Sequence, residues 1–292
     1  CCTMLEKLGL GTVQFGQAYG VSNTRGQVPL EDAAAILARA AASGITLLDT
    51  AANYGDAESV LAKLNTAPFR VVSKTIGLKH GLEAVIDRAR QSAADLKADT
   101  LLVHAASDLH GADGQALWVA LQRLRGEGVF RKIGISVYVA DDPVRLAASF
   151  RPDVMQLPFS LLDQRLLANG TLARLTELGV EVHARSLFLQ GLLFLETLPE
   201  KLRHAAPRLA AIRSQLRDAG TTPLAAALGF VLSRPQIAFG LIGVTSVQEM
   251  DEIVAAARRP LPDLDWAAFA LDDDVTLTPS LWGARRRRGG HR

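Results

Sequence analysis

Thr46-Leu-Leu-Asp-Thr-Ala-Ala-Asn-Tyr-Gly55 is an apolar run that ends in Asp49 and is followed, five residues later, by Tyr54. Three further runs have the same form and also end in a polar residue: residues 71–74 in Lys74, residues 101–104 in His104 and residues 133–136 in Ser136. If each run is a parallel strand, these polar residues lie at the carboxyl ends of the strands, on the rim where an α/β barrel builds its active site. An acid, a phenol, an ammonium and an imidazole on one rim suit general acid–base chemistry.

The rest of the chain repeats this alternation of short apolar runs with helix-like stretches. We expect eight strands, at residues 7–13, 46–49, 71–74, 100–104, 133–136, 153–157, 180–185 and 237–244. Thr222-Pro223 and Ser246-Val-Gln-Glu249 mark helix starts, and the second has the form of a capping box. This pattern predicts a single-domain α/β protein, a (β/α)8 TIM barrel over residues 1–284. A doubly wound Rossmann sheet fits less well, because Gly9-Leu-Gly11-Thr-Val-Gln lacks the third glycine of the dinucleotide fingerprint.

The composition describes a globular protein without a marked preference for charged partners. Hydrophobic residues make up 49% of the 292 residues, and the net charge of +2 gives no reason to expect nucleic acid. No apolar run approaches the roughly 18 residues of a membrane helix, and we see no signal peptide. The only cysteines, Cys1 and Cys2, fit a reducing compartment, so we expect a cytoplasmic protein. Residues 285–292 carry a basic cluster and are expected to form a disordered tail; the alternative is a contact with an acidic surface or nucleic acid.

Each rim residue also has an ordinary structural interpretation when it is taken alone. Asp49 could cap a turn, and Tyr54 could be a half-buried aromatic. Lys74 could be a solvated strand end, and His104 a hydrogen-bonded residue of the barrel mouth. Their joint occurrence favours a catalytic group, because an ammonium stabilises a neighbouring phenolate and a neutral imidazole can orient a carbonyl oxygen. The sequence has no HExxH, CxxC or P-loop lysine, so it indicates neither a metal site nor a nucleoside triphosphate site.

Taken in order, these segments resemble the aldo-keto reductase superfamily, in particular a bacterial branch, over nearly the whole chain. The loop 49–55 is similar to the family's aspartate–tyrosine segment, Ser73-Lys74 to its lysine strand and Val103-His104 to its histidine strand. Further similar segments are Lys132-Ile-Gly-Ile-Ser136, Val154-Met-Gln-Leu-Pro-Phe-Ser-Leu-Leu-Asp163, Ala184-Arg-Ser-Leu-Phe-Leu-Gln-Gly-Leu-Leu193 and Pro223-Leu-Ala-Ala-Ala-Leu-Gly-Phe-Val-Leu-Ser233.

The resemblance implies a nicotinamide cofactor that lies extended across the barrel mouth. Tyr54 would be the acid/base, tuned by Asp49 and Lys74, and His104 would orient the substrate. The residues that it implies in cofactor binding are Gly11, Thr12, Asp49, Ser136, Gln156, Arg185, Ser186, Leu187, Gln190, Gly191, Gly243, Thr245, Ser246, Glu249 and Glu252. Thr245 and Ser246 stand at a helix start, where free N–H groups and the helix dipole favour a phosphate.

Three positions depart from the pattern of the family. Val137 replaces the asparagine that often follows the serine, so one contact to the carboxamide is missing. Arg185 stands where many members stack a tyrosine on the nicotinamide, and a guanidinium can also stack or reach the pyrophosphate. The lysine and arginine that often hold a 2′-phosphate after the last strand are absent, and Val244 and Glu249 occupy those places.

Two lines of argument conflict over the cofactor. No lysine or arginine occurs between residues 242 and 253, whereas Glu249, Asp251 and Glu252 are acidic. An acid repels a 2′-phosphate but can accept a hydrogen bond from the 2′-hydroxyl of NAD. Glu249 could instead cap the helix with Ser246, and the arginines at 258 and 259 could fold back to the adenosine. The resemblance alone places NADP(H) slightly ahead of NAD(H).

We expect an NAD(P)(H)-dependent oxidoreductase that reduces aldehydes or ketones to alcohols, or oxidises a sugar hemiacetal, with the hydride from the nicotinamide and the proton from Tyr54. The alternatives are a cofactor-binding regulatory or redox-sensing subunit of the same fold, and a barrel lyase or isomerase without a nicotinamide. The partner is a small carbonyl or sugar molecule, and the sequence does not indicate the oligomeric state. We expect a glycine-rich loop at residues 15–20 and a long polar loop at residues 105–115. Substrate determinants are expected in the loops 14–23 and 105–115 and in the C-terminal segment 265–282. The last segment would fold over the mouth with Trp282 in the pocket, or else pack on the bottom or side of the barrel.

Overall fold

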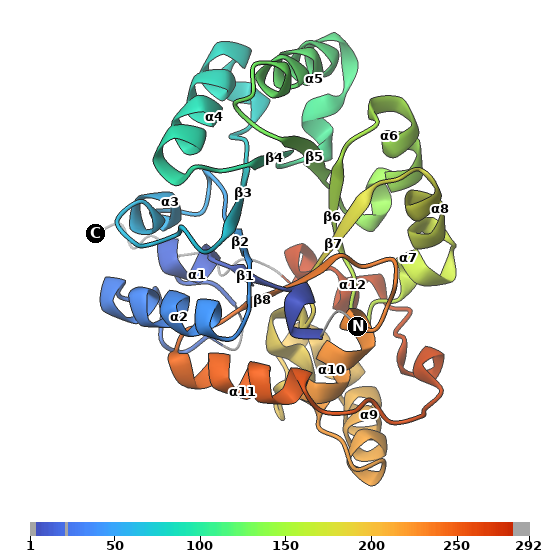
Figure 1. Ribbon diagram of the computed structural model, residues 1–292. Helices are drawn as coiled ribbons and strands as arrows, with labels where there is room; N and C mark the ends of the chain where they lie inside the picture. Colours follow the sequence, from blue (N-terminus) through green and yellow to red (C-terminus); the bar gives the residue numbers. More distant parts are fainter. Residues whose placement is uncertain (1–3, 21–22, 283–292) are drawn as a thin grey trace, which may run out of the picture.

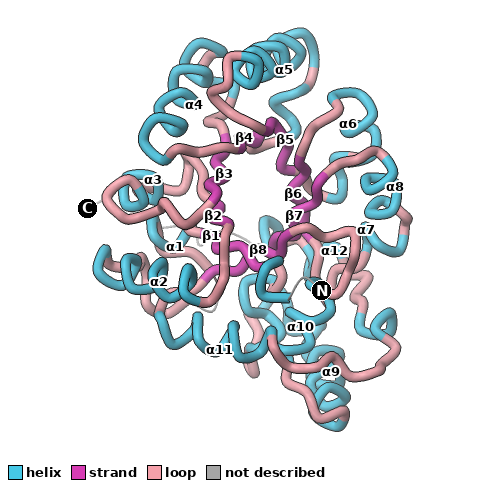
Figure 2. Tube along the Cα trace, in the orientation of Figure 1, coloured by secondary structure: helices cyan, strands magenta, loops and turns pink. Residues whose placement is uncertain are grey.

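The protein is described by a computed structural model that covers residues 4–20 and 23–282. Its centre is a closed barrel of eight parallel strands, in which each strand pairs with the next along the chain and β8 pairs with β1. Figure 2 shows this ring of strands, and Figure 1 shows the helices around it. The strands are β1 (Leu8–Gly11), β2 (Leu47–Asp49), β3 (Arg70–Lys74), β4 (Thr100–Val103), β5 (Lys132–Ser136), β6 (Val154–Pro158), β7 (Glu181–Arg185) and β8 (Phe239–Gly243). The predicted (β/α)8 barrel is confirmed, whereas the predicted tail 285–292 lies outside the described residues.

Helices connect the strands and cover the outside of the barrel (Figure 1). The α-helices of the described residues are α1 (Val13–Gly16), α2 (Leu30–Ala42), α3 (Ala57–Leu61), α4 (Leu82–Leu96), α5 (Gly111–Gly126), α6 (Pro143–Phe150), α7 (Arg165–Ala168), α8 (Thr171–Glu177), α9 (Ala206–Asp218), α10 (Pro223–Leu232), α11 (Val247–Ala257) and α12 (Asp274–Leu277). Short 3-10 helices are η1 (Met4–Lys7), η2 (Leu78–His80), η3 (Ala106–Leu109), η4 (Val139–Asp141), η5 (Leu189–Phe194), η6 (Glu200–Ala205), η7 (Trp266–Phe269) and η8 (Pro279–Leu281). The predicted cap of α10 is confirmed, because the Thr222 hydroxyl accepts a hydrogen bond from the Ala225 N–H at 3.1 Å.

The alternation of side chains along each strand separates an apolar barrel interior from a polar mouth. The interior holds a small buried cluster of Leu47, Val72, Leu102, Val154 and Leu241. Their chain neighbours, such as Leu48 and Val71, belong instead to the larger core that includes the helices. Two residues beyond four of the interior positions stand Asp49, Lys74, His104 and Gln156. Because side chains alternate with a period of two, these polar groups lie on the interior side, above the apolar cluster.

Two segments that were expected to be loops contain helix. β1 ends at Gly11, and α1 occupies part of the expected glycine-rich loop. Residues 105–115 form η3 and the start of α5 instead of a polar loop. Leu109 is buried in the core, and the Asp108 carboxylate accepts the N–H of Leu78 at 3.2 Å. The segment is polar in composition, but its one buried leucine, Leu109, packs in the core and attaches the segment to the barrel.

The C-terminal segment 265–282 packs against the elements that follow β6. The N–H of Leu271 donates to the carbonyl oxygen of Leu162 at 2.9 Å, and Asp274 pairs with Arg165 of α7 at 2.7 Å. The indole N–H of Trp282 donates to the carbonyl oxygen of Val275, within the same segment, at 2.9 Å. These contacts fasten the segment to the loop after β6 and to α7.

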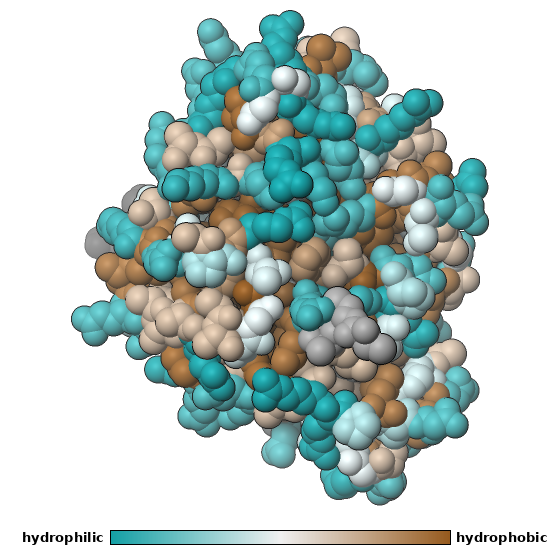
Figure 3. Space-filling view, viewed as in Figure 1, coloured by the Kyte–Doolittle hydropathy of each residue, from teal (hydrophilic) through white to brown (hydrophobic). Residues whose placement is uncertain are grey.

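Hydrophilic side chains cover much of the face shown in Figure 3, and hydrophobic side chains lie scattered between them. Such scattered apolar groups are usual for a surface in contact with water. Among the described residues, no helix combines the length and the apolar character that crossing a membrane requires.

Candidate active site

Asp49 and Lys74 form a buried ion pair at the mouth of the barrel. The Nζ atom of Lys74 lies 2.6 Å from Oδ1 of Asp49 and 2.9 Å from the carbonyl oxygen of Thr50. The second carboxylate oxygen of Asp49 accepts a hydrogen bond from the side-chain amide of Gln156 at 2.7 Å. Lys74 is 1% exposed and Asp49 is 3% exposed. Charges buried this deeply depend on such partners, because water no longer solvates them.

The surroundings of Lys74 keep its ammonium charged. Burial lowers the pKa of Lys74, whereas the charge of Asp49 and the phenol of Tyr54 raise it, and the resulting pKa lies above the ordinary value. The Nζ atom of Lys74 lies 4.8 Å from the centroid of the Tyr54 ring. A fixed cation therefore stands beside the phenol ring.

His104 meets the ring of Tyr54 edge-on, with the ring centroids 5.7 Å apart and the planes at 86°. Burial, followed by the nearby charge of Lys74, lowers the pKa of His104 from 6.5 to about 4. The imidazole is therefore neutral near pH 7 and offers one donor and one acceptor. Its buried Nδ1 atom has no hydrogen-bond partner among the described residues.

A contact between two glycines positions the loop that carries Tyr54. Gly55 has a φ of +54°, and a Cβ there would lie 2.3 Å from the carbonyl oxygen of Gly16. A Cβ on Gly16 would lie 1.8 Å from the carbonyl oxygen of Tyr54. The N–H of Asp56 donates to the Gly16 carbonyl oxygen at 3.2 Å. The end of α1 thus lies directly against this loop, at a distance that only glycine allows.

A buried carboxylate behind this loop connects α3 with β3 and α4. Glu58 is 7% exposed and accepts hydrogen bonds from the hydroxyls of Ser73 and Ser92. It also forms an ion pair with Arg88 of α4. Ser73 immediately precedes the buried lysine, so this network fixes the strand of the lysine relative to the helix that follows the phenol.

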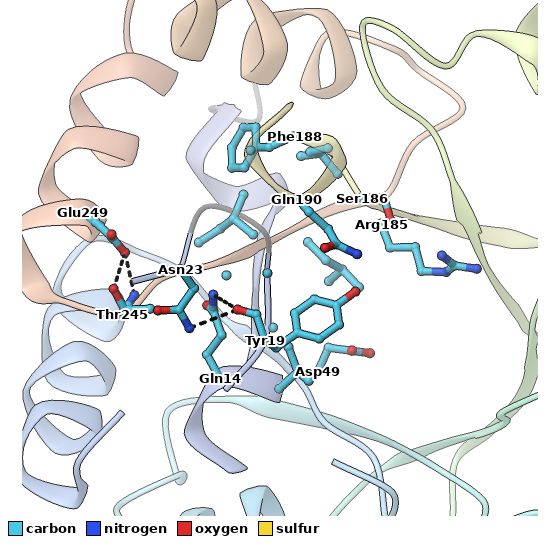
Figure 4. Close-up of a pocket in the computed structure, with 18 of the residues that line it drawn as sticks. Gln14, Tyr19, Asn23, Asp49, Arg185, Ser186, Phe188, Gln190, Thr245 and Glu249 are labelled. Carbon is cyan, nitrogen blue, oxygen red and sulfur yellow. Dashed lines mark hydrogen bonds between the residues drawn. The ribbon is translucent and has the colours of Figure 1, made fainter. Parts of the chain in front are cut away.

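A cavity of about 730 Å³ opens above the ion pair and the phenol, within the usual range of cofactor and small-molecule sites. It is elongated, as Figure 4 shows: Thr245 and Glu249 lie at one end, and Arg185 lies at the other with Asp49 below it. Tyr19 extends between the two ends, with its hydroxyl toward Gln190.

Most of the residues that the sequence assigned to the site line this cavity. They are Tyr54 and His104, together with Gly11, Asp49, Ser136, Gln156, Arg185, Ser186, Leu187, Gln190, Gly191, Gly243, Thr245, Glu249 and Glu252. Three lie outside the lining. Lys74 is buried behind Asp49, and the hydroxyl of Thr12 donates to the Asp49 carbonyl oxygen at 3.0 Å. The hydroxyl of Ser246 caps α11 by accepting the N–H of Glu249 at 3.1 Å.

Of the three segments expected to hold substrate determinants, one contributes to the described lining. Residues 14–23 supply Gln14, Gln17, Tyr19, Gly20 and Asn23. No described residue of 105–115 or 265–282, Trp282 included, lines the cavity. Both segments make their contacts outside the cavity. The first packs Leu109 in the core, and the second pairs Asp274 with Arg165.

The loop after β7 has a left-handed backbone turn. Ser186, Leu189 and Gln190 have φ values of 59°, 45° and 53°, and Gly191 has 86°. Left-handed conformations cost non-glycine residues roughly 1–2 kcal/mol each. Successive N–H groups in such turns form concave nests that bind anions. The N–H groups of Leu189 and Gly191 donate within the loop, to the carbonyl oxygens of Ser186 and Phe188 at 3.0 and 2.8 Å, so an anion would be bound by the other N–H groups of the turn, such as that of Gln190.

Arg185 is held at the catalytic end of the cavity by the residues that follow β5. Its guanidinium donates to the carbonyl oxygen of Val137 at 2.9 Å and lies 4.5 Å from the centroid of the Tyr138 ring. This fixed charge also contributes, after burial and Lys74, to the lowered pKa of His104.

Comparison with known proteins identifies the family. The aldo/keto reductase family model matches residues 7–270, which is most of the chain. The chain belongs to the aldo/keto reductase family. It is therefore an oxidoreductase of that family, and the resemblance that the sequence motifs indicated is confirmed.

Individual relatives are distant. An uncharacterized oxidoreductase of Mycobacterium tuberculosis and its counterpart in Mycobacterium bovis are each 26% identical over 286 residues, covering 87% of this chain and 84% of theirs. An aldo-keto reductase of Bacillus halodurans, solved in a holo form, superposes with a TM-score of 0.68 at 20% identity and covers 88% of each chain. An aldose reductase of Giardia lamblia gives 0.65 at 17% identity, covering 90% of this chain and 91% of its own. At these identities the solved structures support the fold.

Several cavity residues of this aldo/keto reductase were missed by sequence reasoning. They are aromatic or apolar: Tyr138, Phe188, Phe194, Leu224 and Ile253. Tyr138 could have been found, because it stands two residues after Ser136 and the strand alternation continues to it. Phe188 and Phe194 carry no such signal, since the loop that bears them has no regular period.

Proposed function

We propose that this aldo/keto reductase reduces aldehydes or ketones to alcohols with a nicotinamide dinucleotide, or oxidises a sugar hemiacetal in the opposite direction. One observation carries the proposal. The Lys74 ammonium lies 2.6 Å from the Asp49 carboxylate and 4.8 Å from the centroid of the Tyr54 ring, and the neutral imidazole of His104 meets that ring edge-on. This arrangement suits proton transfer to a carbonyl oxygen.

The cavity fits the cofactor that this chemistry needs. The left-handed turn of residues 186–191 offers a phosphate the N–H groups that the loop does not use itself, such as that of Gln190, and Ser136 and Gln156 present polar groups at the catalytic end. The buried Oε1 atom of Gln14, which also lines the cavity, has no hydrogen-bond partner among the described residues. It can therefore accept a hydrogen bond from the cofactor. We assign cofactor binding to these groups and to the other lining residues named above. When bound, the nicotinamide supplies or accepts the hydride.

The residues of this chain handle the proton. In the reduction, the hydroxyl of Tyr54 donates its proton to the carbonyl oxygen, and the Lys74 ammonium stabilises the phenolate that results. Asp49 holds Lys74 in place through their 2.6 Å contact. His104, neutral at pH 7, hydrogen-bonds the same carbonyl oxygen and orients it. In the oxidation, the phenolate of Tyr54 accepts the proton of the alcohol.

The substrate is a small carbonyl or sugar molecule, and Tyr19, Tyr138 and Arg185 surround the catalytic end with polar groups. For the cofactor, family resemblance alone favours NADP(H). We place the enzyme in the cytoplasm on its cysteine usage and treat residues 1–284 as one catalytic domain.

A substrate panel tests the proposal. Aldehydes, ketones and aldoses are incubated with each reduced or oxidised cofactor, and cofactor absorbance is followed. Turnover of at least one carbonyl or sugar is expected. Tight cofactor binding without turnover would instead favour a regulatory subunit, and the absence of cofactor binding would favour a lyase or isomerase.

A further inference from the structure

Glu249, on the first turn of α11, directs its carboxylate back onto Thr245. One carboxylate oxygen accepts the backbone N–H of Thr245 at 2.6 Å and its hydroxyl at 3.0 Å. Figure 4 shows this pair of hydrogen bonds at the end of the cavity opposite to Arg185. In an ordinary capping box the acid would bond the N–H of the N-cap, which here is Ser246. Of the two residues at which the sequence suggested a phosphate, Thr245 thus has both of its donors engaged by a negative charge of the chain itself.

Among the described residues, the rest of this end of the cavity adds no positive charge. Glu252 also lines the cavity, and its carboxylate accepts the side-chain amide of Gln248 at 3.0 Å. The third acid of this turn, Asp251, is paired with Arg39 of α2 and is absent from the lining. Two carboxylates therefore face the cavity here.

The lysines and arginines of the described part of the chain that could have compensated these charges lie elsewhere. Arg185 is the single lysine or arginine in the described lining, and it is fixed at the opposite end against Tyr138. Arg259 donates to the carbonyl oxygen of Gly220 at 3.3 Å, and Arg258 is exposed outside the lining. Neither arginine folds back to the adenosine end.

We infer that this chain is selective for NAD(H), and that Glu249 excludes the 2′-phosphate of NADP(H). The inference rests on the proposed function, because a nicotinamide over Tyr54 places the adenosine at the end of Glu249. A 2′-phosphate there meets a carboxylate and finds the donors of Thr245 in use. A 2′-hydroxyl can instead donate to the second carboxylate oxygen of Glu249, which has no hydrogen-bond donor among the described residues. This contact reverses the preference that resemblance alone suggested.

Binding measurements on the wild-type enzyme test this selectivity without turnover. Isothermal titration with NADH and NADPH gives the ratio of their dissociation constants. We expect NADH to bind at least about tenfold more tightly, or about 1.4 kcal/mol. The pair 5′-AMP and adenosine 2′,5′-bisphosphate, which lack the nicotinamide, is expected to show the same order. Equal or tighter binding of NADPH and of the bisphosphate would overturn the inference.

Two matched variants assign the effect to Glu249. Glu249→Gln keeps an acceptor for Thr245 but removes the charge, so the ratio is expected to fall at least about threefold toward NADPH. Asp251→Asn, on the same turn but paired with Arg39 outside the lining, is expected to leave the ratio unchanged. If the ratio of the NADH and NADPH dissociation constants were the same in the two variants, the role of Glu249 would be overturned. The comparison of 5′-AMP with adenosine 2′,5′-bisphosphate uses the wild-type enzyme, so it does not depend on the folding of the variants. If wild-type enzyme bound neither dinucleotide, the proposed function itself would fail, and the inference with it.

Discussion

At the scale of single residues, Asp49 connects the proton chemistry to the fold. Its two oxygens serve two partners, Lys74 at 2.6 Å and Gln156 at 2.7 Å, from strands on either side of the mouth. Leaving either charge of the buried pair alone would be strongly unfavourable, typically by about 3–5 kcal/mol. The cation beside Tyr54 is therefore held by the same contacts that stabilise the mouth of the barrel.

Tyr54→Phe tests the proton donor. The change removes the phenolic hydroxyl and keeps the ring that Lys74 and His104 contact. Because general acid–base catalysis typically contributes about 10²- to 10⁴-fold, kcat is expected to fall by that amount. Cofactor binding, measured by fluorescence titration, is expected to stay within about threefold of wild type. A variant that kept more than about a tenth of the wild-type kcat would exclude Tyr54 as the acid.

The lowered pKa of His104 predicts a loss of stability in acid. Its pKa is 6.5 when unperturbed and about 4 in the folded enzyme, so between these values the unfolded chain binds the extra proton. The neutral imidazole contributes its full stability above about pH 6.5 and loses it as the pH falls toward 4, on the order of 2 kcal/mol given its partial exposure. Urea unfolding of wild type and His104→Gln at pH 7 and pH 4.5 measures this term. The advantage of the wild type over the variant is expected to shrink at the lower pH, and a constant difference would contradict it.

At the scale of elements, the position of Tyr54 depends on how closely α1 approaches the loop after β2. Strand alternation predicted where Asp49, Lys74 and His104 would point, because that period is a local property of the chain. The contact between Gly16 and Gly55 could not be predicted in the same way. It joins segments that are far apart in sequence, and a glycine in a glycine-rich loop gives no sign of its partner.

Gly16→Ala tests this contact. The added methyl group would lie 1.8 Å from the carbonyl oxygen of Tyr54, so the loop must move. Overpacking of this kind typically destabilises by about 1–3 kcal/mol, and a displaced phenol is expected to lower kcat more than it raises KM. Gly126→Ala, at the end of α5 with no neighbour within 4 Å of the new Cβ, is the matched control and is expected to retain activity. Wild-type kcat in Gly16→Ala would show that the contact does not position Tyr54.

At the scale of the whole molecule, the sequence predicted the barrel and most of its mouth because each βα unit repeats one local pattern. Positions at strand ends, such as Ser136 and Gln156, follow from that pattern. The course of the last 18 described residues, 265–282, did not follow from it. Their placement depends on ion pairs such as Arg165 with Asp274, and charged residues on a surface do not reveal their partners in sequence.

Trp282→Ala tests the observed position of the C-terminal segment. The indole is partly buried against the core and donates to the carbonyl oxygens of Val275 and Thr276 at 2.9 and 3.3 Å, outside the cavity lining. Its removal is expected to lower the free energy of unfolding by about 1–2 kcal/mol, since both packing and hydrogen bonds are lost. KM values for a small and a bulky carbonyl are expected to change by the same factor. Leu281→Ala, at a side chain that is 52% exposed, is the control and is expected to stay within about 0.5 kcal/mol of wild type. A rise in KM confined to the bulky substrate would return Trp282 to the pocket.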